Sequence, residues 1–342
     1  MNNNYKLIMK LTDRIHAFDK LGNILSGIHK DGQFKAVLAN VTKQNPWFVK
    51  KNIEHAVLSV SSLLKKDSLY LWVSQYDLNN IPKKVGVIVP GNIPLVGFLD
   101  FLCVLISGNI YVGQLSHSNN ILLPFIASIL IKIDMRFNSC IKFPDNLSDL
   151  DFLIATGNDT TAKFFNYRHI DLARIIRKNR NSVAVLNGLE DEIDYKGLFF
   201  DIVMYFGLGC RNVSKIFVPA NFNWNKLEEV FNELDYLFIE YYMDNLTNQM
   251  ALCEINSINY LKFNKLLFIE NNYLSSPVGV VFYEYYTDLQ SVINKINSDM
   301  SNIQCVVTNI KSINKSVSFG KAQHPTLYDW PDGIDVIDSI LK

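Results

Sequence analysis

The spacing of hydrophobic residues divides the chain into a helical beginning and a longer region in which strands and helices alternate. Residues 7–25 and 54–73 place apolar side chains three and four positions apart, which is the pattern of an amphipathic helix. The segment KQNPWF, residues 43–48, interrupts this pattern. We therefore expect the first quarter of the chain to be helical and to carry no catalytic residue.

From Val85 onward, short apolar runs alternate with longer apolar segments. The short runs are bounded by turn residues, so they predict buried strands. Strands of this kind separated by helices are typical of a parallel sheet that is covered on both faces and joined by right-handed crossovers. The expected strands are 85–89, 109–114, 140–143 and 151–155, and the expected helices are 95–107 and 121–133.

A second strand-rich region starts near Gly188 and repeats the alternation. Its expected strands are 216–219, 266–270, 278–286 and 303–308, and its expected helices are 224–238 and 288–299. A length of 342 residues also favours about two domains of ordinary size. We therefore predict an α/β fold with two α/β domains, residues 1–188 and residues 189–342.

The apolar segment 85–113 is long enough to be mistaken for a membrane span. Pro90 and Pro94 break it after a few residues, and Asp100 would be a costly charge in lipid. A buried strand, a loop and a buried helix account for all of these features. We expect no membrane span.

Composition and charge narrow the class of function. Hydrophobic residues make up 49% of the chain, as expected of a folded globular protein, and 33 basic residues balance 33 acidic ones. A net charge of zero removes any general electrostatic reason to bind nucleic acid, so we expect chemistry on small molecules. The frequent asparagines can reflect codon bias, and we give their local clusters no mechanistic weight.

The five cysteines are too far apart for a CxxC metal site, and their odd number does not suggest a disulfide framework. The N-terminus has no uninterrupted apolar stretch of the kind found in secretory signals. We therefore expect a reducing, cytoplasmic location and no bound metal. Cys103, Cys140, Cys253 and Cys305 lie in apolar or amphipathic segments and are interpreted as small packing residues.

Two loops follow expected strands at the edge where parallel sheets bind ligands. They are PGNIPLVG, which begins at Pro90, and ATGNDTT, which begins at Ala155; neither is the GxGxxG dinucleotide fingerprint. Each loop can bind a nucleotide or be an ordinary connection. The basic cluster RIIRKNR, residues 174–180, can likewise hold phosphates or be a charged strand entry in solvent.

Cys210 stands apart from the other cysteines because it follows Gly207 and Gly209 in YFGLGCRNVSKIFVP. The glycines allow a sharp turn, and Arg211 would favour a thiolate if its guanidinium lay near the sulfur. From these residues alone, Cys210 is either a nucleophile displayed on a loop or a small core residue.

Six motifs, taken together, resemble those of a known family. In chain order they are VGVIVPGNIPLVGFLDFLCVLISGN, ATGND, IIRKNRNSVAVLNG, GLGCRNVSKIFV, LSSPVGVVFYEYYTDLQSVI and SFGKAQHP. Their order resembles the acyl-CoA reductase family (the LuxC-type long-chain fatty-acid reductases) of the aldehyde dehydrogenase superfamily, over about residues 80–325. The resemblance implies a Rossmann-like cofactor domain within 1–188, after a helical N-terminal segment. It also implies a catalytic domain with a C-terminal return segment within 189–342.

By this resemblance, Cys210 corresponds to the catalytic nucleophile. Asn92 corresponds to the asparagine whose amide forms the oxyanion hole together with the backbone N–H of the nucleophile. The proton donor is harder to assign; His324 is the only histidine in the matched catalytic half, although histidine is often merely structural.

The resemblance also implies a nicotinamide cofactor. Thr156 and Gly157 correspond to the turn near the dinucleotide phosphates, and Gln114 and Ser116 to the segment that contacts the adenosine ribose. The superfamily commonly has a lysine where this chain has Gln114. This departure leaves NADPH or NADH open, and the family favours NADPH.

A second departure concerns the glutamate that activates water in hydrolytic aldehyde dehydrogenases. Arg177 or a neighbour takes its position, and no glutamate lies between Cys140 and Gly188. Without that base, an acyl-cysteine should persist until a hydride donor or a thiol reaches it. This favours NAD(P)H-dependent reduction of an acyl-CoA or other acyl thioester to an aldehyde through an acyl-cysteine, with CoA as the leaving group.

Three alternatives stay open at this point. One is a CoA-acylating aldehyde dehydrogenase that works oxidatively, another is an acyltransferase or thioesterase that uses Cys210, and the third is a catalytically silent scaffold. The acyl chain length is also open: Phe206, Phe217 and Tyr273 can line an apolar tunnel or simply pack the core. The superfamily usually forms dimers or tetramers, so a homo-oligomer is possible.

Overall fold

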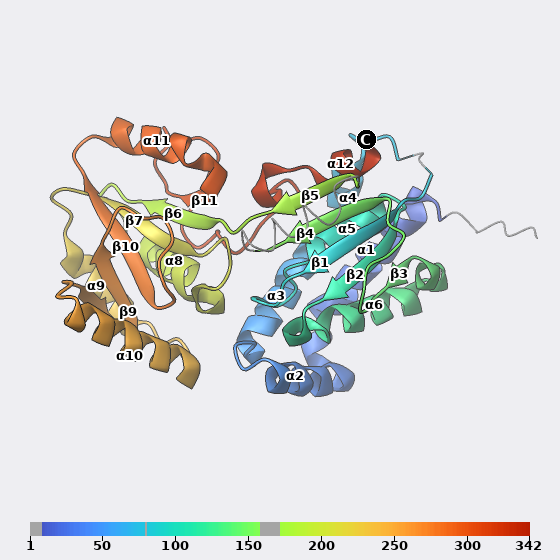
Figure 1. The fold of residues 1–342 in the computed structure, drawn as a ribbon, viewed down its shortest axis with the longest axis horizontal. Helices are drawn as coiled ribbons and strands as arrows, with labels where there is room; N and C mark the ends of the chain where they lie inside the picture. The colour runs from blue at the N-terminus through green and yellow to red at the C-terminus, as the bar shows by residue number, and fades with distance from the viewer. Residues whose placement is uncertain (1–8, 79–80, 158–171) are drawn as a thin grey trace, which may run out of the picture. The chain divides into compact units, whose positions relative to one another are not determined.

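The computed structural model describes residues 9–78, 81–157 and 172–342 (Figure 1). The chain divides into two compact units. The first consists of the residues up to Asn179 together with Thr326–Lys342, and the second is Arg180–Pro325. Each unit contains its own β-sheet with helices packed around it.

The N-terminal part of the first unit is helical, as predicted. Its helices are α1 (Leu11–Ser26), α2 (Gly32–Gln44), α3 (Lys50–Leu63) and α4 (Lys66–Val73). The helix expected over 54–73 is therefore two helices. The backbone is extended at Lys65, and Asp19 of α1 accepts a hydrogen bond from the N–H of Lys66 at the start of α4 (3.0 Å). This side chain satisfies one of the N–H groups that a new helix leaves unpaired.

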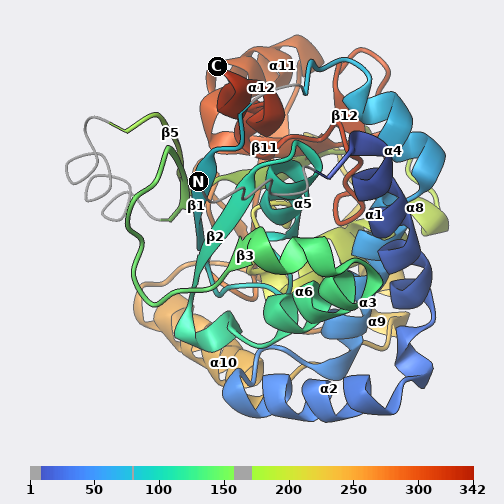
Figure 2. The same cartoon turned by 90° about the vertical axis from the view of Figure 1, so that its right-hand side faces the viewer.

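The sheet of the first unit is parallel throughout, with the order β3-β2-β1-β4-β5 (Figure 1). Figure 2 shows its neighbouring strands β1, β2 and β3 from another side. Its strands are β1 (Lys84–Val89), β2 (Ile110–Leu115), β3 (Ile141–Lys142), β4 (Phe152–Thr156) and β5 (Arg174–Arg177), and its helices are α5 (Phe98–Ile106), α6 (Leu122–Ile133) and the C-terminal α12 (Val336–Leu341). The expected alternation of strands and helices is confirmed. The strand order reverses between β1 and β4, and open α/β sheets bind ligands at the carboxyl edge beside such a reversal.

The apolar segment 85–113 forms β1, buried α5 and most of β2. Within the part of the chain that the structure describes, no helix is both long and apolar enough to cross a membrane.

The second unit contains a seven-stranded sheet with the order β12-β11-β6-β7-β10-β9-β8. Neighbouring strands are parallel except for β8 and β9. The strands are β6 (Asn181–Val185), β7 (Val213–Pro219), β8 (Leu261–Phe263), β9 (Leu266–Glu270), β10 (Val280–Tyr286), β11 (Ile303–Val307) and β12 (Ser316–Val317). The helices are α8 (Glu192–Val203), α9 (Trp224–Glu233), α10 (Glu240–Ile255) and α11 (Leu289–Ser298).

Six short 3₁₀ helices complete the described elements. They are η1 (Ile28–Lys30), η2 (His117–Asn119), η3 (Met135–Ser139), η4 (Met204–Gly207), η5 (Met300–Asn302) and η6 (Pro331–Gly333).

The two units differ from the predicted domains 1–188 and 189–342 in two places. Strand β6 pairs with β7 and β11, so it belongs to the second sheet although the prediction placed it in the first domain. The C-terminal residues return to the first unit. Lys83 donates to the carbonyl of Ile340 (2.6 Å), and the Tyr76 hydroxyl donates to Asp335 (2.6 Å).

Candidate active site

The predicted residues of the first unit lie along one edge of its sheet. Asn92 follows β1, Gln114 and Ser116 lie at the end of β2, and Thr156 with Gly157 ends β4. These strands are direct neighbours in the order β2-β1-β4 and run in the same direction, so all five residues lie at the carboxyl edge of the sheet. The fold thus brings together residues that are up to 65 positions apart in the sequence.

Two buried asparagines hold the loop that carries Asn92. Nδ2 of Asn119 donates to the carbonyls of Pro90 (3.3 Å) and Ile93 (3.4 Å), and Nδ2 of Asn45 donates to the carbonyl of Gly91 (3.4 Å). Buried polar side chains with several backbone partners fix a loop geometry. Asn92 itself is exposed, on a loop whose backbone these two asparagines hold.

The loop of β1 also packs closely against the end of β2. A Cβ atom at Gly91 would lie 2.1 Å from Oγ of Ser118 and 2.6 Å from Oγ of Ser116. Any side chain at position 91 would therefore displace these hydroxyls. Ser116 and Ser118 share a hydrogen bond of 2.9 Å, and Gln114 donates from Nε2 to the carbonyl of Asp145 (2.6 Å).

Thr156 and Gly157 are half-buried, and the N–H of Gly157 donates to the carbonyl of Arg177 on β5 (3.2 Å). The rest of the ATGNDTT loop, from Asn158, lies outside the described residues.

Arg177 faces the interior of the first unit. It is 4% exposed and forms two hydrogen bonds with the carboxylate of Asp100 on α5 (2.7 and 2.9 Å). Its guanidinium is therefore committed to an ion pair, and residues 174–177 form strand β5. For Arg177, this excludes the phosphate-binding interpretation of the RIIRKNR cluster.

Cys210 lies in the second unit, on the loop between η4 and β7. Tyr205, Phe206 and Gly207 have consecutive positive φ angles of 53, 59 and 78°. A left-handed conformation costs a non-glycine residue roughly 1–2 kcal/mol, so the loop is held there by its surroundings. Cys210 is exposed, and Ser182 on β6 donates from Oγ to its carbonyl oxygen (3.0 Å).

The other cysteines differ from Cys210 in exposure. Cys103, Cys253 and Cys305 are buried and Cys140 is half-buried. The structure describes all five, and none forms a disulfide.

Asn212 organises the Cys210 loop from the inside. Its buried Nδ2 donates to the carbonyls of Asp201 (3.2 Å), Ile202 (3.1 Å) and Met204 (2.7 Å), at the end of α8. Its Oδ1 accepts from the N–H of Gly209 (2.9 Å). One side chain therefore supports both the end of the helix and the residue before Cys210.

Asp201 connects the Phe319–Gly320 segment to the end of α8, which Asn212 also contacts. The buried carboxylate of Asp201 accepts hydrogen bonds from the N–H groups of Gly320 (2.7 Å) and Ala322 (3.0 Å). Burial raises the pKa of Asp201 to about 7, although the two N–H donors, Arg211 and Lys321 act in the opposite direction.

The Phe319–Gly320 segment lies very close to α8, and glycines at positions 197 and 320 allow this. A Cβ atom at Gly197 of α8 would lie 2.7 Å from the backbone nitrogen of Gly320. Gly320 itself has a φ of 77°.

Arg211 donates from Nε to the carbonyl of Ala322. This bond ties the residue after Cys210 to the Phe319–Gly320 segment. The role suggested for Arg211, favouring a thiolate at Cys210, stays a prediction. His324 is exposed, and partial desolvation and Lys321 lower its pKa.

The three aromatic residues considered for a tunnel have different surroundings. Phe206 and Asn212 are among the residues lining a narrow pocket of about 40 Å³ within the second unit. Phe217 is packed in a core cluster of that unit, and Tyr273 is 71% exposed. Of the three, Phe206 shares a pocket with Gly207 and Asn212 of the Cys210 loop.

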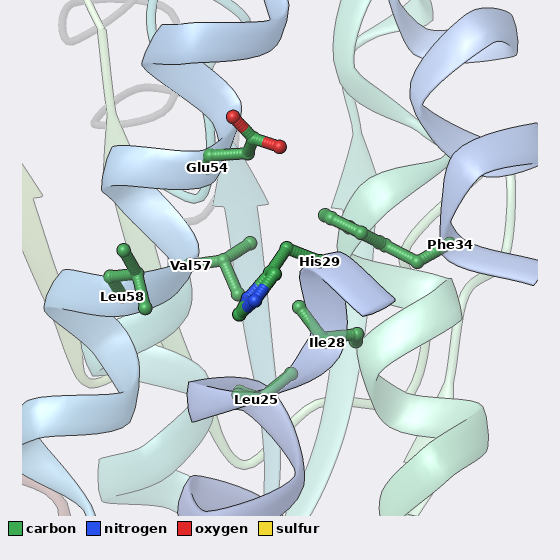
Figure 3. Close-up of a pocket in the computed structure, with 7 residues that line it drawn as sticks. All are labelled: Leu25, Ile28, His29, Phe34, Glu54, Val57 and Leu58. Atoms are coloured by element: carbon green, nitrogen blue, oxygen red, sulfur yellow. The ribbon is translucent and has the colours of Figure 1, made fainter. Parts of the chain in front are cut away.

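A separate pocket of about 230 Å³ lies among the N-terminal helices (Figure 3). His29 and Glu54 are its titratable lining residues; the others are Leu25, Ile28, Phe34, Val57 and Leu58. None of the predicted site residues lines it.

No protein-family model matches the sequence, and no curated protein matches it. Solved structures do resemble it. An oxidoreductase from Marinobacter aquaeolei aligns with a TM-score of 0.69 and 12% identity, over 93% of this chain and 79% of that one. The NAD⁺ complex of an aldehyde dehydrogenase from Bacillus cereus aligns with a TM-score of 0.65 and 15% identity, over 91% and 74%.

An acetylating aldehyde dehydrogenase from Geobacillus thermoglucosidasius aligns with a TM-score of 0.63 and 11% identity, over 93% of this chain and 86% of that one. This chain has the aldehyde dehydrogenase fold. The predicted fold class, an aldehyde-dehydrogenase-like α/β fold with two α/β domains and a helical N-terminal segment, is confirmed.

Four residues of this aldehyde dehydrogenase fold support the candidate site and were missed in the sequence. They are Asn45, Asn119, Asn212 and Asp201. Because asparagine is abundant throughout the chain, the three asparagines carried no distinguishing signal. The only local clue to Asn212 is its position two residues after Cys210 in a glycine-rich turn.

Proposed function

We propose that this protein reduces an acyl-CoA or a related acyl thioester to an aldehyde, with NAD(P)H as reductant and Cys210 as the nucleophile. The observation that carries the proposal is the exposure of Cys210 on a constrained loop. It is the exposed cysteine of the five, on a loop held by the buried Asn212 and by a run of left-handed residues. Such strain concentrates at functional sites. The aldehyde dehydrogenase fold supports redox chemistry on an aldehyde or its acyl equivalent.

The residues at the carboxyl edge of the first sheet fit a dinucleotide. Ser116 and Thr156 provide hydroxyl groups, and Gln114 provides an amide. Gly157 has no side chain, so a phosphate can approach its backbone. All four residues are partly exposed. They lie at the carboxyl ends of β2 and β4, on either side of β1, where the strand order favours such a ligand. A bound nicotinamide cofactor supplies the hydride that reduces the acyl group.

In the proposed reaction, the thiolate of Cys210 attacks the carbonyl carbon of the acyl thioester, forming a C–S bond and an oxyanion. The proposal assigns the amide of Asn92 and the N–H of Cys210 to this oxyanion. The C–S bond to CoA then breaks, CoA leaves as its thiolate, and the acyl group remains on Sγ. After reduction, the thiohemiacetal oxyanion collapses to aldehyde and regenerates the Cys210 thiolate, so the charges balance without a proton donor.

Hydrolysis of the acyl-cysteine is disfavoured in this proposal. Arg177, at the position of the hydrolytic glutamate, is held by Asp100 and has no basic lone pair to activate water. A long-lived thioester suits transfer to hydride or to a thiol.

The decisive experiment is intact-mass analysis after mixing the protein with a long-chain acyl-CoA, with and without NADPH. We expect an acyl adduct on Cys210 that disappears as aldehyde when NADPH is added. Cys210→Ser should form no adduct, whereas Cys140→Ser, at the half-buried cysteine, should behave like the native protein.

Other results would select another function. Release of CoA without consumption of either NADPH or NADH indicates an acyltransferase or thioesterase, and faster acyl-CoA formation from aldehyde, NAD(P)⁺ and CoA indicates the oxidative direction. Absence of an adduct on any cysteine across chain lengths would contradict the covalent mechanism. Parallel assays with NADPH and NADH decide the cofactor, for which the family resemblance favours NADPH.

A further inference from the structure

Helix α1 carries a charged residue on its buried face. Arg14, Phe18, Leu21 and Leu25 are buried and follow the spacing of an apolar stripe. Arg14 is 7% exposed. Because a guanidinium stays protonated in proteins, α1 places a permanent positive charge inside the first unit.

The carboxylates around Arg14 are committed elsewhere. Its Nε is enclosed and has no hydrogen-bond partner in the part of the chain that the structure describes. The neighbouring carboxylate, Asp13, pairs with Arg136 (2.9 Å), and Arg136 also binds Asp134 (2.6 Å).

The guanidinium lies against the backbone at the end of α5. Gly108 has a φ of 87°, and a Cβ atom there would lie 1.9 Å from Nη1 of Arg14. The carboxyl end of a helix carries about half a negative charge, which balances only part of a full positive one. Consistent with this, burial lowers the pKa of Arg14, while Cys140 and Asp13 act in the opposite direction.

Arg14 lines a cavity of about 320 Å³. Arg136 is its second basic residue, and Leu105, Ile110 and Phe137 contribute apolar wall. The described residues that line the cavity include no aspartate or glutamate. Its volume is at the lower end of the range for small-molecule pockets, so a compact ligand fits it.

The cavity is separate from the edge proposed to bind the dinucleotide. Ile110 begins β2, whereas Ser116 follows the other end of that strand. Six residues of extended chain span about 20 Å. The two sites therefore lie at opposite edges of the same sheet.

We propose that this cavity binds a small amphipathic carboxylate, with its carboxyl group on Arg14 and its apolar part against Leu105, Ile110 and Phe137. A carboxylate matches the planar fork of a guanidinium. It also suits the pairing of the charges: Asp13 and Asp134 both bind Arg136, so Arg14 has no ion-pair partner of its own among the described residues. The apolar wall disfavours a phosphate, which needs polar partners on every side. This inference does not depend on the proposed reaction.

The test measures binding of octanoate to the full chain by isothermal titration calorimetry, with octanamide as its neutral counterpart and inorganic phosphate as a bare anion. We expect octanoate to bind about tenfold or more tightly than either. Arg14→Met, which keeps apolar bulk, should weaken octanoate about tenfold and leave octanamide unchanged. Lys20→Met makes the same charge change at an exposed position of α1 and should leave both affinities unchanged.

A second measurement uses only the native chain. Cys140 lines the cavity, so octanoate should slow its alkylation by iodoacetamide, followed by peptide mass analysis, and octanamide should not. Equal binding of octanoate and octanamide, tighter binding of phosphate, or no protection of Cys140 would each overturn the assignment. So would unchanged octanoate affinity in a folded Arg14→Met variant.

Discussion

Arg177 on β5 and Asp100 on α5 form a bidentate ion pair inside the first unit, with N–O distances of 2.7 and 2.9 Å and side chains that are 4% and 6% exposed. The carboxylate of Asp100, which argued against a membrane span, therefore has a buried ion-pair partner in Arg177. The pair fixes the edge strand β5 to the helix that covers the sheet.

Removing one member of this pair should be costly. Asp100→Ala leaves the Arg177 charge buried and uncompensated, so the free energy of unfolding should fall by about 3–5 kcal/mol. Replacing both residues, as Asp100→Leu with Arg177→Met, should restore most of that loss because no charge is left buried. Urea unfolding of Asp100→Leu, Arg177→Met and the double variant measures the coupling, and simple additivity would show that the pair contributes little.

Asn212→Ala should loosen the Cys210 loop. The substitution leaves buried carbonyls at the end of α8 and the N–H of Gly209 without their partner. Since each unsatisfied buried group costs about 1–3 kcal/mol, we expect a loss of about 3 kcal/mol in urea unfolding. The rate of Cys210 alkylation should change as well.

The control is Asn256→Ala, which removes a single hydrogen bond from an exposed asparagine to a carbonyl of its own helix. It should cost less than about 1 kcal/mol. Equal losses in the two variants would mean that Asn212 does not organise the loop.

Much of the fold could be predicted because buried parallel strands leave a strong pattern. The apolar runs at 85–89 and 151–155 correspond closely to β1 and β4. Helix α8 was missed because it is buried on most sides and shows little amphipathic periodicity, although Asp191 and Asp194 form a capping box at its start. The helix expected to reach Phe238 ends at Glu233, where Asn264 binds the carbonyls of Phe231 and Leu234.

The sequence could propose candidate site residues only where they stand in a motif, and these assignments stay predictions. Cys210, Asn92 and the Thr156–Gly157 turn stand in motifs, so local sequence singled them out. The supports, Asn119 and Asp201, act across 26 and 119 positions of sequence or more, through contacts that exist only after folding. No spacing rule reveals such contacts.

Asn92→Ala should impair the proposed chemistry without unfolding the protein. Asn92 is exposed, so its truncation should change the free energy of unfolding by less than about 0.5 kcal/mol. Loss of an oxyanion donor lowers turnover about 100-fold or more, measured as NAD(P)H consumption with an acyl-CoA. Asn119→Ala is the contrasting variant, because it removes the support of the same loop and should lower stability as well as turnover.

Stability should depend on pH through Asp201. Its pKa in the folded state is about 7, above the ordinary value near 4, so the folded protein holds this proton more tightly than the unfolded chain does. The stabilisation that the protonated Asp201 contributes is complete below about pH 4, and it is lost as the pH rises through about 7. Urea unfolding should show about 2–3 kcal/mol less stability at pH 8 than at pH 5 from this group.

Asp201→Asn removes the titration while keeping one acceptor for the Gly320 and Ala322 N–H groups. Its stability should therefore stay close to that of the native protein at pH 5, where Asp201 is protonated, and change less between pH 5 and pH 8. Asp244→Asn, at an exposed acid, should leave the native pH dependence unchanged. If the free energy of unfolding of Asp201→Asn changed with pH as steeply as that of the native protein, Asp201 would not be the titrating group.

Gly197→Ala tests the close approach of α8 to the Phe319–Gly320 segment. In an open helix, alanine is more favourable than glycine by about 1 kcal/mol. At Gly197 the new Cβ would lie 2.7 Å from the nitrogen of Gly320 and from the carbonyl carbon of Phe319, both backbone atoms that cannot rotate away. We expect a net loss of about 1–3 kcal/mol in urea unfolding, together with a changed alkylation rate at Cys210.

Gly32→Ala is the matched control, since Gly32 also lies in a helix and its Cβ would meet no atom within 4 Å. Its stability should stay unchanged or rise slightly. If Gly197→Ala and Gly32→Ala stabilised the protein by similar amounts, α8 would have space for a Cβ atom at Gly197. The Phe319–Gly320 segment would then depend on the Asp201 hydrogen bonds alone for its attachment to α8.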